Sequence, residues 1–365
     1  MKKIYSILAL LSISLILAQA GTPATPYYDG SNWTLTGTAL KNALATKITI
    51  THTNFLSYTP GIWEADMITD VDPNNPNNVL LIYGWENGTD GIVTNDRSRD
   101  KNNHGGNSGQ WNREHVYAKS LGTPTLLDGG SGESSDAGED AHHLRPADVQ
   151  WNGTRGNLTF ATGSGNSGNV AGGWYPGDEW KGDVARMMMY MYLRYGTQCL
   201  PINVGTGTTP VSDSNMVNLF LQWNAEDPVS AFEDTRNTYH GNTANTYAQG
   251  NRNPFIDNPY LATLIWGGSV AENRWPSVIL ATETFNKFAN ISIYPNPSNN
   301  HKINIQTDIV LDEIDLININ GQLIQVIKKP SLKNNVYSLE NLPQGFYFMK
   351  MTSDNQSATK SIIVN

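Results

Sequence analysis

The sequence predicts an α+β domain followed by a small all-β sandwich. Helical and strand-like patterns are mixed over residues 36–268, whereas after about Asn290 the chain contains only short runs of alternating polar and apolar residues. A length of 365 residues exceeds the usual size of one domain. Two folded units are therefore expected.

Residues 1–20 have the pattern of a secretory signal peptide. Lys2 and Lys3 precede an apolar run over residues 4–17, and Ala18-Gln19-Ala20 provides a small-x-small cleavage site. The apolar run is too short to span a membrane, and no second one follows. We therefore expect an exported protein without a stable membrane span.

The first elements after the signal peptide are a helix and two strands. Leu40, Leu44 and Ile48 recur at helical spacing, which predicts a helix over residues 36–48. Residues 62–68 and 79–83 are strand-like runs separated by a Pro/Asn-rich turn.

Three short motifs carry the chemistry. Residues 112–117 are predicted to form a strand that contains Glu114 and His115, whose side chains alternate to opposite faces. The runs EDAHHLRP (139–146) and NGTRGN (152–157) follow, and a turn or short helix returns the second run toward the Glu-His pair. Together they supply a hard oxygen ligand, a base that titrates near neutrality, a cation and a second oxygen ligand. Metal-assisted phosphodiester hydrolysis needs these groups.

Two features of these motifs allow a structural interpretation as well as a functional one. His142 and His143 are adjacent, so their side chains diverge and are poor joint ligands of one ion. Either one of them is a structural hydrogen-bonding group, or Asp140 orients an imidazole for function. Asn157 follows a Gly, and an Asn in that position is commonly a turn residue.

The rest of the first unit is predicted to be helical. Asp183 is expected to cap a Met-rich helix that ends at Gly196. Two further helices are predicted to open at Asp213 and at Asp227, and a last one covers residues 257–266.

The last 75 or so residues are predicted to form the β-sandwich, because short runs suited to strands alternate with turns. The Asn320-Gly321 pair between two of these runs is a hairpin signal. The predicted strands are residues 291–294, 302–306, 314–319, 322–327, 336–339, 345–351 and 360–364.

The net charge limits how the protein binds a polyanion. The formal charge is −9 at pH 7, which excludes a broadly basic surface of the kind used by general nucleic-acid binders. A local cationic cleft on an acidic body is still expected, since five arginines lie in or near the motifs. They are Arg113, Arg145, Arg155, Arg186 and Arg252.

Residues 60–267 resemble the bacterial endonuclease I family of secreted or periplasmic nucleases, which have a ββα-metal (His-Me finger) core. The resemblance is carried by NREHV (112–116), DAHHLRP (140–146), RGN (155–157), GDVAR (182–186) and NRNPFID (251–257), in the family's order. It implies that His115 is the general base and that Glu114 and Asn157 bind a divalent ion, Mg²⁺ or else Mn²⁺ or Ca²⁺. It also implies a sequence-nonspecific endonuclease that cuts DNA, and RNA as well, to 5′-phosphate and 3′-hydroxyl ends.

The sequence departs from a family relative at the phosphate-anchoring arginine. The relative has this Arg in the loop after the Glu-His motif, but residues 119–144 contain none. We hypothesise that Arg145 or Arg155 replaces it as a catalytic residue. The other motif residues are expected to support the site or to bind substrate; they are Arg113, Asp140, His142, His143 and Arg252.

The tail resembles the C-terminal sorting domain of the type IX secretion system. The match is carried by YPNPS (294–298), ING (319–321), LPQGFY (342–347) and KSIIV (360–364). It implies that the secretion machinery is a partner and that the protein, expected to be a monomer, is released or held at the cell surface. The expected organisation is signal peptide 1–20, nuclease domain 21–283, linker 284–290 and sorting domain 291–365.

Two other functions are compatible with the sequence. The chain could be an extracellular binding or adhesive protein on an inactive nuclease scaffold, with some of its Trp residues stacking on sugars. It could also keep the fold and hydrolyse a different phosphodiester. A His115→Ala variant separates the binding protein from the enzyme, because only the enzyme loses its function.

Overall fold

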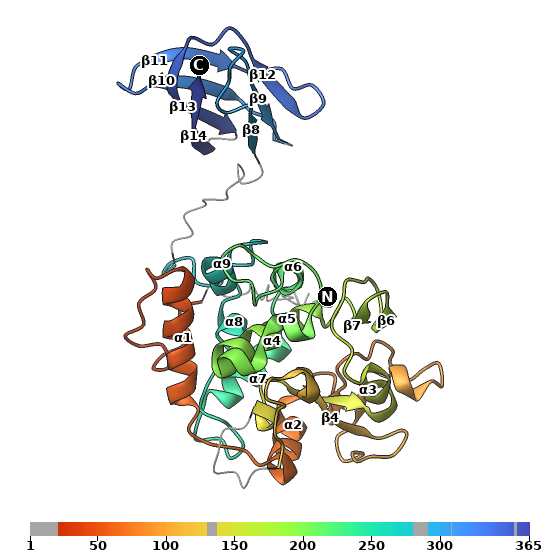
Figure 1. The fold of residues 1–365 in the computed structure, drawn as a ribbon. Coiled ribbons are helices and arrows are strands. Elements are labelled where there is room, and N and C mark those ends of the chain that lie inside the picture. Colours follow the sequence, from red (N-terminus) through yellow and green to blue (C-terminus); the bar gives the residue numbers. More distant parts are fainter. Residues whose placement is uncertain (1–20, 130–136, 280–290, 308, 354–355) are drawn as a thin grey trace, which may run out of the picture. The chain divides into compact units, whose positions relative to one another are not determined.

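The computed structural model describes residues 21–129, 137–279, 291–307, 309–353 and 356–365 (Figure 1). The chain divides into two compact units, residues 1–280 and residues 281–365. The predicted signal peptide and the predicted linker at 284–290 lie outside the described residues.

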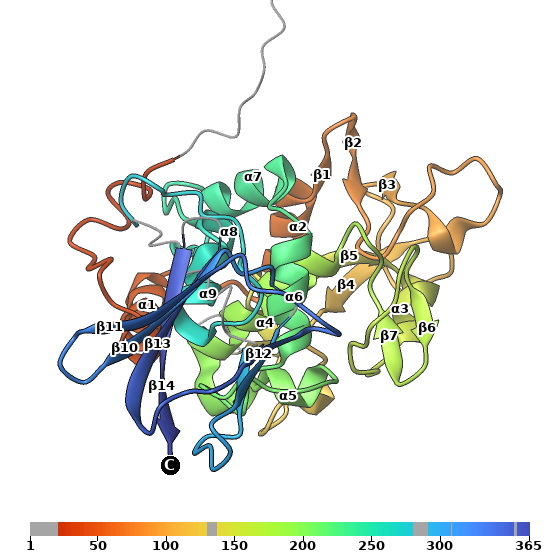
Figure 2. The same ribbon diagram turned by 90° about the horizontal axis from the view of Figure 1, so that it is seen from above.

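A β-β-α unit lies in the first of these two units. Strands β4 (Trp111–His115) and β5 (Leu144–Asp148) pair antiparallel, with Glu114 opposite Arg145, and helix α3 (Val149–Arg155) follows β5 directly. Figures 1 and 2 both show α3 beside β4. The ββα core implied by the resemblance is therefore present.

The boundaries of α3 have local causes. The Asp148 side chain accepts hydrogen bonds from the backbone N–H groups of Gln150 and Trp151, so it caps the first turn. Gly156 ends the helix with φ 52°, a left-handed conformation that a side chain with a Cβ disfavours. The chain can therefore turn sharply and present the next residue, Asn157, at the end of α3.

Two small sheets flank this unit. The first is antiparallel with the strand order β1-β2-β3, and the second is the β6-β7 hairpin. The strands are β1 (Val71–Asp72), β2 (Asn75–Leu80), β3 (Ser98–Asp100), β6 (Gly168–Val170) and β7 (Gly173–Tyr175).

The predicted strand at residues 62–68 is wrong, because this segment forms helix α2 (Trp63–Thr69). The buried positions within residues 62–69 are Ile62, Ala65, Asp66 and Thr69, a spacing of three, one and three residues. That spacing places them on one face of a helix, whereas a strand would bury every second residue. A short apolar run is compatible with either a helix or a strand, and here tertiary contacts favoured the helix.

Helix α4 (Lys181–Tyr195) is the central element of the helical part, and every residue from Gly182 to Leu193 is buried. Its Met residues pack in the main hydrophobic core. Helix α1 (Gly37–Thr51), predicted at residues 36–48, packs against α4 and buries Leu40, Leu44 and Ile48 in the same core. The remaining α-helices are α5 (Pro201–Val204), α6 (Asn218–Glu226), α7 (Ala231–His240), α8 (Pro254–Asp257) and α9 (Tyr260–Trp266). Shorter helical turns are Tyr58–Ile62, Val93–Asn95, Lys119–Leu121, Ala137–Glu139 and Gly196–Cys199.

The helix starts predicted at acidic residues are displaced. Helix α4 begins two residues before Asp183, which instead lies in its first turn. Asp227 does not cap α7 but accepts a hydrogen bond from the backbone N–H of Gly182 in α4, at 2.8 Å. Ser230 caps α7 in a capping box with Glu233. Several residue types can cap a helix, and tertiary contacts recruited these Asp side chains elsewhere.

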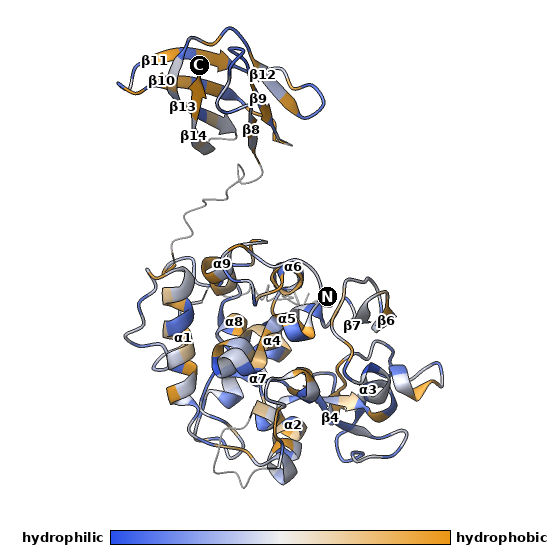
Figure 3. Cartoon of the chain, in the orientation of Figure 1, coloured by the Kyte–Doolittle hydropathy of each residue, from blue (hydrophilic) through white to orange (hydrophobic). Residues whose placement is uncertain are grey.

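The second unit contains the seven strands that were predicted. They form a four-stranded sheet in the order β11-β10-β13-β14 and a three-stranded sheet in the order β12-β9-β8, with a shared apolar core. Figure 3 shows hydrophobic residues along these strands. Gly321 in the β10–β11 turn has φ 77°, which confirms the hairpin at Asn320-Gly321. The strands are β8 (Ser292–Tyr294), β9 (Ile303–Gln306), β10 (Glu313–Asn318), β11 (Leu323–Lys328), β12 (Val336–Leu339), β13 (Gly345–Ser353) and β14 (Gln356–Val364).

Candidate active site

One pocket of about 350 Å³ brings the predicted base and both predicted metal ligands together. Its walls come from β4, from the segment that follows β4, and from the end of α3. The lining residues are Arg113, Glu114, His115, Ala118, Lys119, Ser120, Thr125, Asn152, Arg155, Gly156 and Asn157.

His115 is half-buried at the end of β4, and its tautomer follows from one hydrogen bond. Nε2 lies 2.9 Å from the carbonyl oxygen of Gly138, so Nε2 carries the proton and donates, and Nδ1 keeps its lone pair. Burial, and then the nearby His143 ring, hold the pKa of His115 well below its ordinary value of 6.5. The imidazole is therefore neutral at physiological pH and can accept a proton at Nδ1.

Glu114 is buried beside this histidine and held in one orientation. Its Oε1 accepts hydrogen bonds from the Tyr83 hydroxyl at 3.1 Å and from Arg155 Nη1 at 3.0 Å. Burial raises the pKa of Glu114 to about 7, against the opposing effects of Arg155 and Tyr83. A cation at the carboxylate would favour the charged form, so the environment suits a metal ligand.

Asn157 is exposed at the pocket and follows the end of α3. Its Nδ2 donates to Ser120 Oγ at 3.3 Å, so the amide oxygen is oriented away from that contact. Asn152 also borders the pocket and donates from Nδ2 to Asn112 Oδ1 at 2.8 Å. Asn152 was not predicted from the sequence to lie at the site, although its spacing of three residues from Arg155 places both on one face of a helix.

Arg155 has a positioning role, and the hypothesis that it anchors the phosphate is not supported. The side chain is buried. Nη1 donates to Glu114 and to the His115 carbonyl at 3.1 Å, and Nη2 donates to the Val116 carbonyl at 2.9 Å. The guanidinium is therefore used to hold Glu114 and the end of β4.

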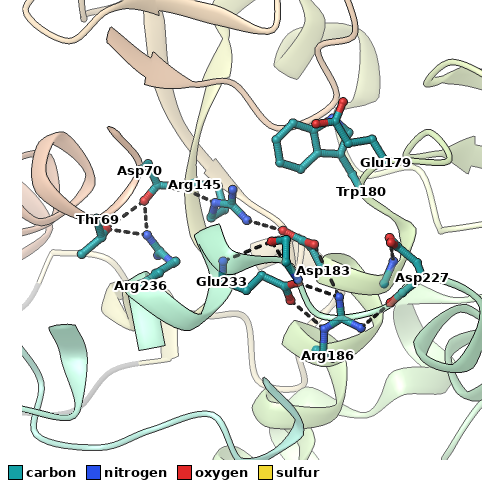
Figure 4. Close-up of polar contacts among 12 residues, drawn as sticks. Thr69, Asp70, Arg145, Glu179, Trp180, Asp183, Arg186, Asp227, Glu233 and Arg236 are labelled. Carbon is teal, nitrogen blue, oxygen red and sulfur yellow. Dashed lines mark hydrogen bonds and ion pairs between the residues drawn. The ribbon is translucent and has the colours of Figure 1, made fainter. Parts of the chain in front are cut away.

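The position of Arg145 disfavours the predicted catalytic role, because the residue lies inside the fold and does not border the pocket. It lies in a buried network of ion pairs, where it donates to Asp70 at 2.5 Å and to Asp183 at 3.2 Å (Figure 4). Arg186 and Arg236 belong to the same network, paired with Glu233 and Asp70. A buried cation is stable only beside carboxylates, so this arginine joins β5 to α2 and α4.

Asp140, His142 and His143 are also buried, which favours the structural interpretation of the histidine pair. Asp140 accepts hydrogen bonds from Tyr190, Tyr195, Gln249 and the backbone of His142. The rings of His142 and His143 bond to different carbonyl groups, and burial lowers the pKa of each to about 4. His143 supports the site indirectly, with its ring centroid 5.6 Å from that of His115.

Arg252 lies outside the pocket, paired with Asp257. Of the five arginines expected in a cationic cleft, only Arg113 and Arg155 border this pocket. The cleft predicted from the sequence is therefore smaller than expected. The other three arginines are mostly held in buried ion pairs.

The oxygen donors of the pocket fit a divalent ion. Within the described ranges, no three His, Cys, Asp or Glu side chains gather into a metal cluster. Glu114 and Asn157 offer one carboxylate and one amide oxygen at the same pocket. Mg²⁺ retains several waters and needs few protein ligands, so this pair suits it chemically.

Comparisons with known proteins identify relatives of this chain. Residues 36–260 match the family model for Endonuclease I. The extracellular ribonuclease of Bacillus subtilis (strain 168) is 42% identical over 266 residues, which cover 68% of this chain and 83% of the relative. The extracellular ribonuclease of Bacillus amyloliquefaciens is 41% identical over 263 residues, with coverages of 69% and 82%. The fold, the site and these relatives define a nuclease, which is a hydrolase.

The chain belongs to the Endonuclease I family. Members of this family generally depend on a divalent metal. Membership confirms the predicted enzyme class and disfavours the alternative of an adhesive protein.

Residues 292–365 match the secretion system C-terminal sorting domain, so the protein is secreted or held at the cell surface. In the part of the chain that the structure describes, no helix has the length and apolarity needed to cross a membrane. A solved structure of PorZ, a surface component of the type IX secretion system of Porphyromonas gingivalis, aligns over 23% of this chain and 12% of that one. The sequence identity is 11% and the TM-score is 0.18, which supports no conclusion about this chain.

Proposed function

We propose that this protein is a divalent-metal-dependent, sequence-nonspecific endonuclease that hydrolyses RNA and DNA to 5′-phosphate and 3′-hydroxyl ends. The observation that carries the proposal is the Nε2 hydrogen bond of His115 to Gly138, which leaves Nδ1 as a free base in the pocket that Glu114 and Asn157 share. Activity on RNA is supported by the relatives, which are named ribonucleases.

The residues at this site have distinct tasks in the proposed reaction. His115 Nδ1 takes a proton from the attacking water, a step worth about 10²–10⁴-fold in rate. Glu114 and Asn157 would hold the cation, and Arg155 and Tyr83 keep the Glu114 carboxylate in place. A divalent ion held there would supply positive charge for the phosphate and a source of acidic water near the leaving 3′-oxygen. We propose Mg²⁺ as the ion, with Mn²⁺ or Ca²⁺ as substitutes.

The lack of sequence preference is expected from how such a pocket contacts its substrate. Groups that hold phosphates position a strand without reading its bases. With a net charge of −9, the protein also cannot rely on a general attraction for polyanions. Binding is therefore expected to be local to the pocket and sensitive to salt.

We also propose that residues 291–365 serve as the export signal for a type IX machinery. In this arrangement residues 1–20 are removed first, and residues 284–290 link the sorting domain to a nuclease domain at 21–283. The match over residues 292–365 supports this organisation.

The test uses the purified chain, stripped with a chelator and incubated with plasmid DNA and with RNA, with and without Mg²⁺. Cutting should require the metal and should be lost in His115→Ala. A matched control is His301→Ala, because His301 also bonds to a backbone carbonyl but lies in the other unit. No cutting by folded wild-type protein with any divalent ion would refute the proposal.

A further inference from the structure

To bind the negatively charged backbone of the substrate, the pocket needs a cationic side chain. Three cationic side chains border it: Arg113, Lys119 and Arg155. Lys119 pairs with Asp128, and Arg155 pairs with Glu114. Among the described residues, Arg113 is the one of these three that has no carboxylate partner.

We propose that Arg113 binds a backbone phosphate of the substrate strand, and that Tyr58 and Trp63 form an aromatic clamp that fixes the plane of its guanidinium. This inference rests on the proposed function. It names the residue by which the same pocket recognises a polynucleotide.

The guanidinium of Arg113 lies against two aromatic rings. Its Cζ is 3.5 Å from the ring centroid of Tyr58 and 4.1 Å from that of Trp63. Trp63 is in turn held edge-on against the buried Trp111, with ring centroids 4.9 Å apart. Stacking on ring faces restricts the guanidinium to one plane without neutralising its charge, which prepares it to bind an anion.

The hydrogen bonds of Arg113 leave one edge of the guanidinium for a ligand. Nη1 donates to the Tyr58 carbonyl and to Thr59 Oγ1. Nε is buried and, within the described ranges, lacks a hydrogen-bond partner, which is unfavourable for a donor. Nε and Nη2 share one edge of the guanidinium. Nη2 makes no hydrogen bond to the part of the chain that the structure describes and is not among the buried atoms, so it can donate to a phosphate oxygen at that edge.

The position of Arg113 on β4 places this edge near the base. Strand alternation puts Arg113 and His115 on the same face, about 7 Å apart along the strand. Tyr58 also stacks on the His115 ring, with centroids 5.4 Å apart. The arginine, its clamp and the base are therefore neighbours, so a strand held at Arg113 would pass His115.

The test measures binding in the full chain with His115→Ala, so that the substrate is not cut. Fluorescence anisotropy of a short labelled single-stranded RNA and of a DNA duplex is followed over a range of KCl concentrations. Arg113→Ala is compared with Arg113→Lys and with Arg97→Ala, which removes the same charge from an ion pair with Glu179 outside the pocket.

Arg113→Ala should weaken binding by about 10- to 100-fold for every sequence. It should also lower the slope of log affinity against log salt by about 1. Arg113→Lys should recover only part of the affinity, because an ammonium lacks the planar fork. Arg97→Ala should bind as the parent does. Equal affinities and equal salt slopes for Arg113→Ala and Arg97→Ala would overturn the proposal.

The clamp has its own test, in which Trp63→Leu removes the ring face and keeps an apolar side chain, whereas Trp63→Phe keeps a face. In the active chain, Trp63→Leu should raise KM more than it lowers kcat, and Trp63→Phe should restore KM. Equal KM values for Trp63→Leu and the parent would refute the positioning role. If the His115→Ala chain binds no nucleic acid at all, the proposed function itself fails, so the two failures are distinguishable.

Discussion

Replacing Arg155 with Met would show how strongly the fold depends on the buried contact that orients Glu114. The guanidinium is 1% exposed and makes hydrogen bonds of 3.0 Å to Glu114 Oε1, 3.1 Å to the His115 carbonyl and 2.9 Å to the Val116 carbonyl. Met fills similar space but makes none of these bonds. The variant therefore removes the cation beside the buried Glu114 carboxylate, which keeps only the Tyr83 hydroxyl of its two donors, and it removes the Arg155 donors to the two carbonyl groups.

The expected cost follows from this geometry. Breaking a buried ion pair on one side costs about 3–5 kcal/mol, because the remaining charge stays buried. Such a decrease in the free energy of unfolding lowers the Tm of a domain as large as the first unit by roughly 6–20 °C, at about 2–4 °C per kcal/mol. Adding Glu114→Gln removes the stranded charge, so the double variant should recover about 2 kcal/mol relative to the sum of the single variants.

The assay is urea unfolding of the metal-free chain, followed by tryptophan emission. All 10 Trp residues lie between Trp33 and Trp275, so the signal reports on the first unit alone. The coupling should be larger at pH 8 than at pH 5.5, because the pKa of Glu114 is about 7 and the carboxyl is largely protonated at the lower pH. A coupling below about 0.5 kcal/mol at pH 8, or an equal coupling at both pH values, would refute the reasoning.

Three further predictions concern other parts of the molecule. The first unit should lose stability as the pH falls from about 6.5 to about 4. Burial lowers the pKa of His142 and His143 to about 4, so over this range the histidines bind protons more readily in the unfolded chain than in the folded one. A urea midpoint that does not change over that range would contradict this prediction. Asp70→Asn should destabilise the first unit by about 3–5 kcal/mol in urea unfolding, since Arg145 and Arg236 both pair with Asp70, and an effect below about 1 kcal/mol would show that the network is not stabilising. Asn157→Ala should raise the Mg²⁺ concentration needed for half-maximal cutting, because a proposed ligand is lost. The urea midpoint should change little, because the residue is exposed. An unchanged Mg²⁺ response would remove Asn157 from the ligand set.

The parts that could be predicted from the sequence are those with local causes. The helix at Leu40, Leu44 and Ile48 and the hairpin at Asn320-Gly321 follow from side-chain spacing and backbone preference within a few residues. The Glu-His pair was found for a similar reason, because two chemically distinctive residues stand next to each other on one strand. The position of Asn157 was expected only through the resemblance to a family, and the turn at Gly156 explains how it reaches the pocket.

What only the tertiary structure decided is which polar side chains are buried and with what partners. Arg113, Arg145 and Arg155 look alike as residues near the motifs, yet one is clamped at the pocket, one lies in an internal ion-pair network, and one holds Glu114. The partners of Arg145 are Asp70 and Asp183, which are 75 and 38 residues away. Ion pairing and burial depend on distances across the fold, so the local pattern specifies the chemical groups and the packing of distant segments assigns their roles.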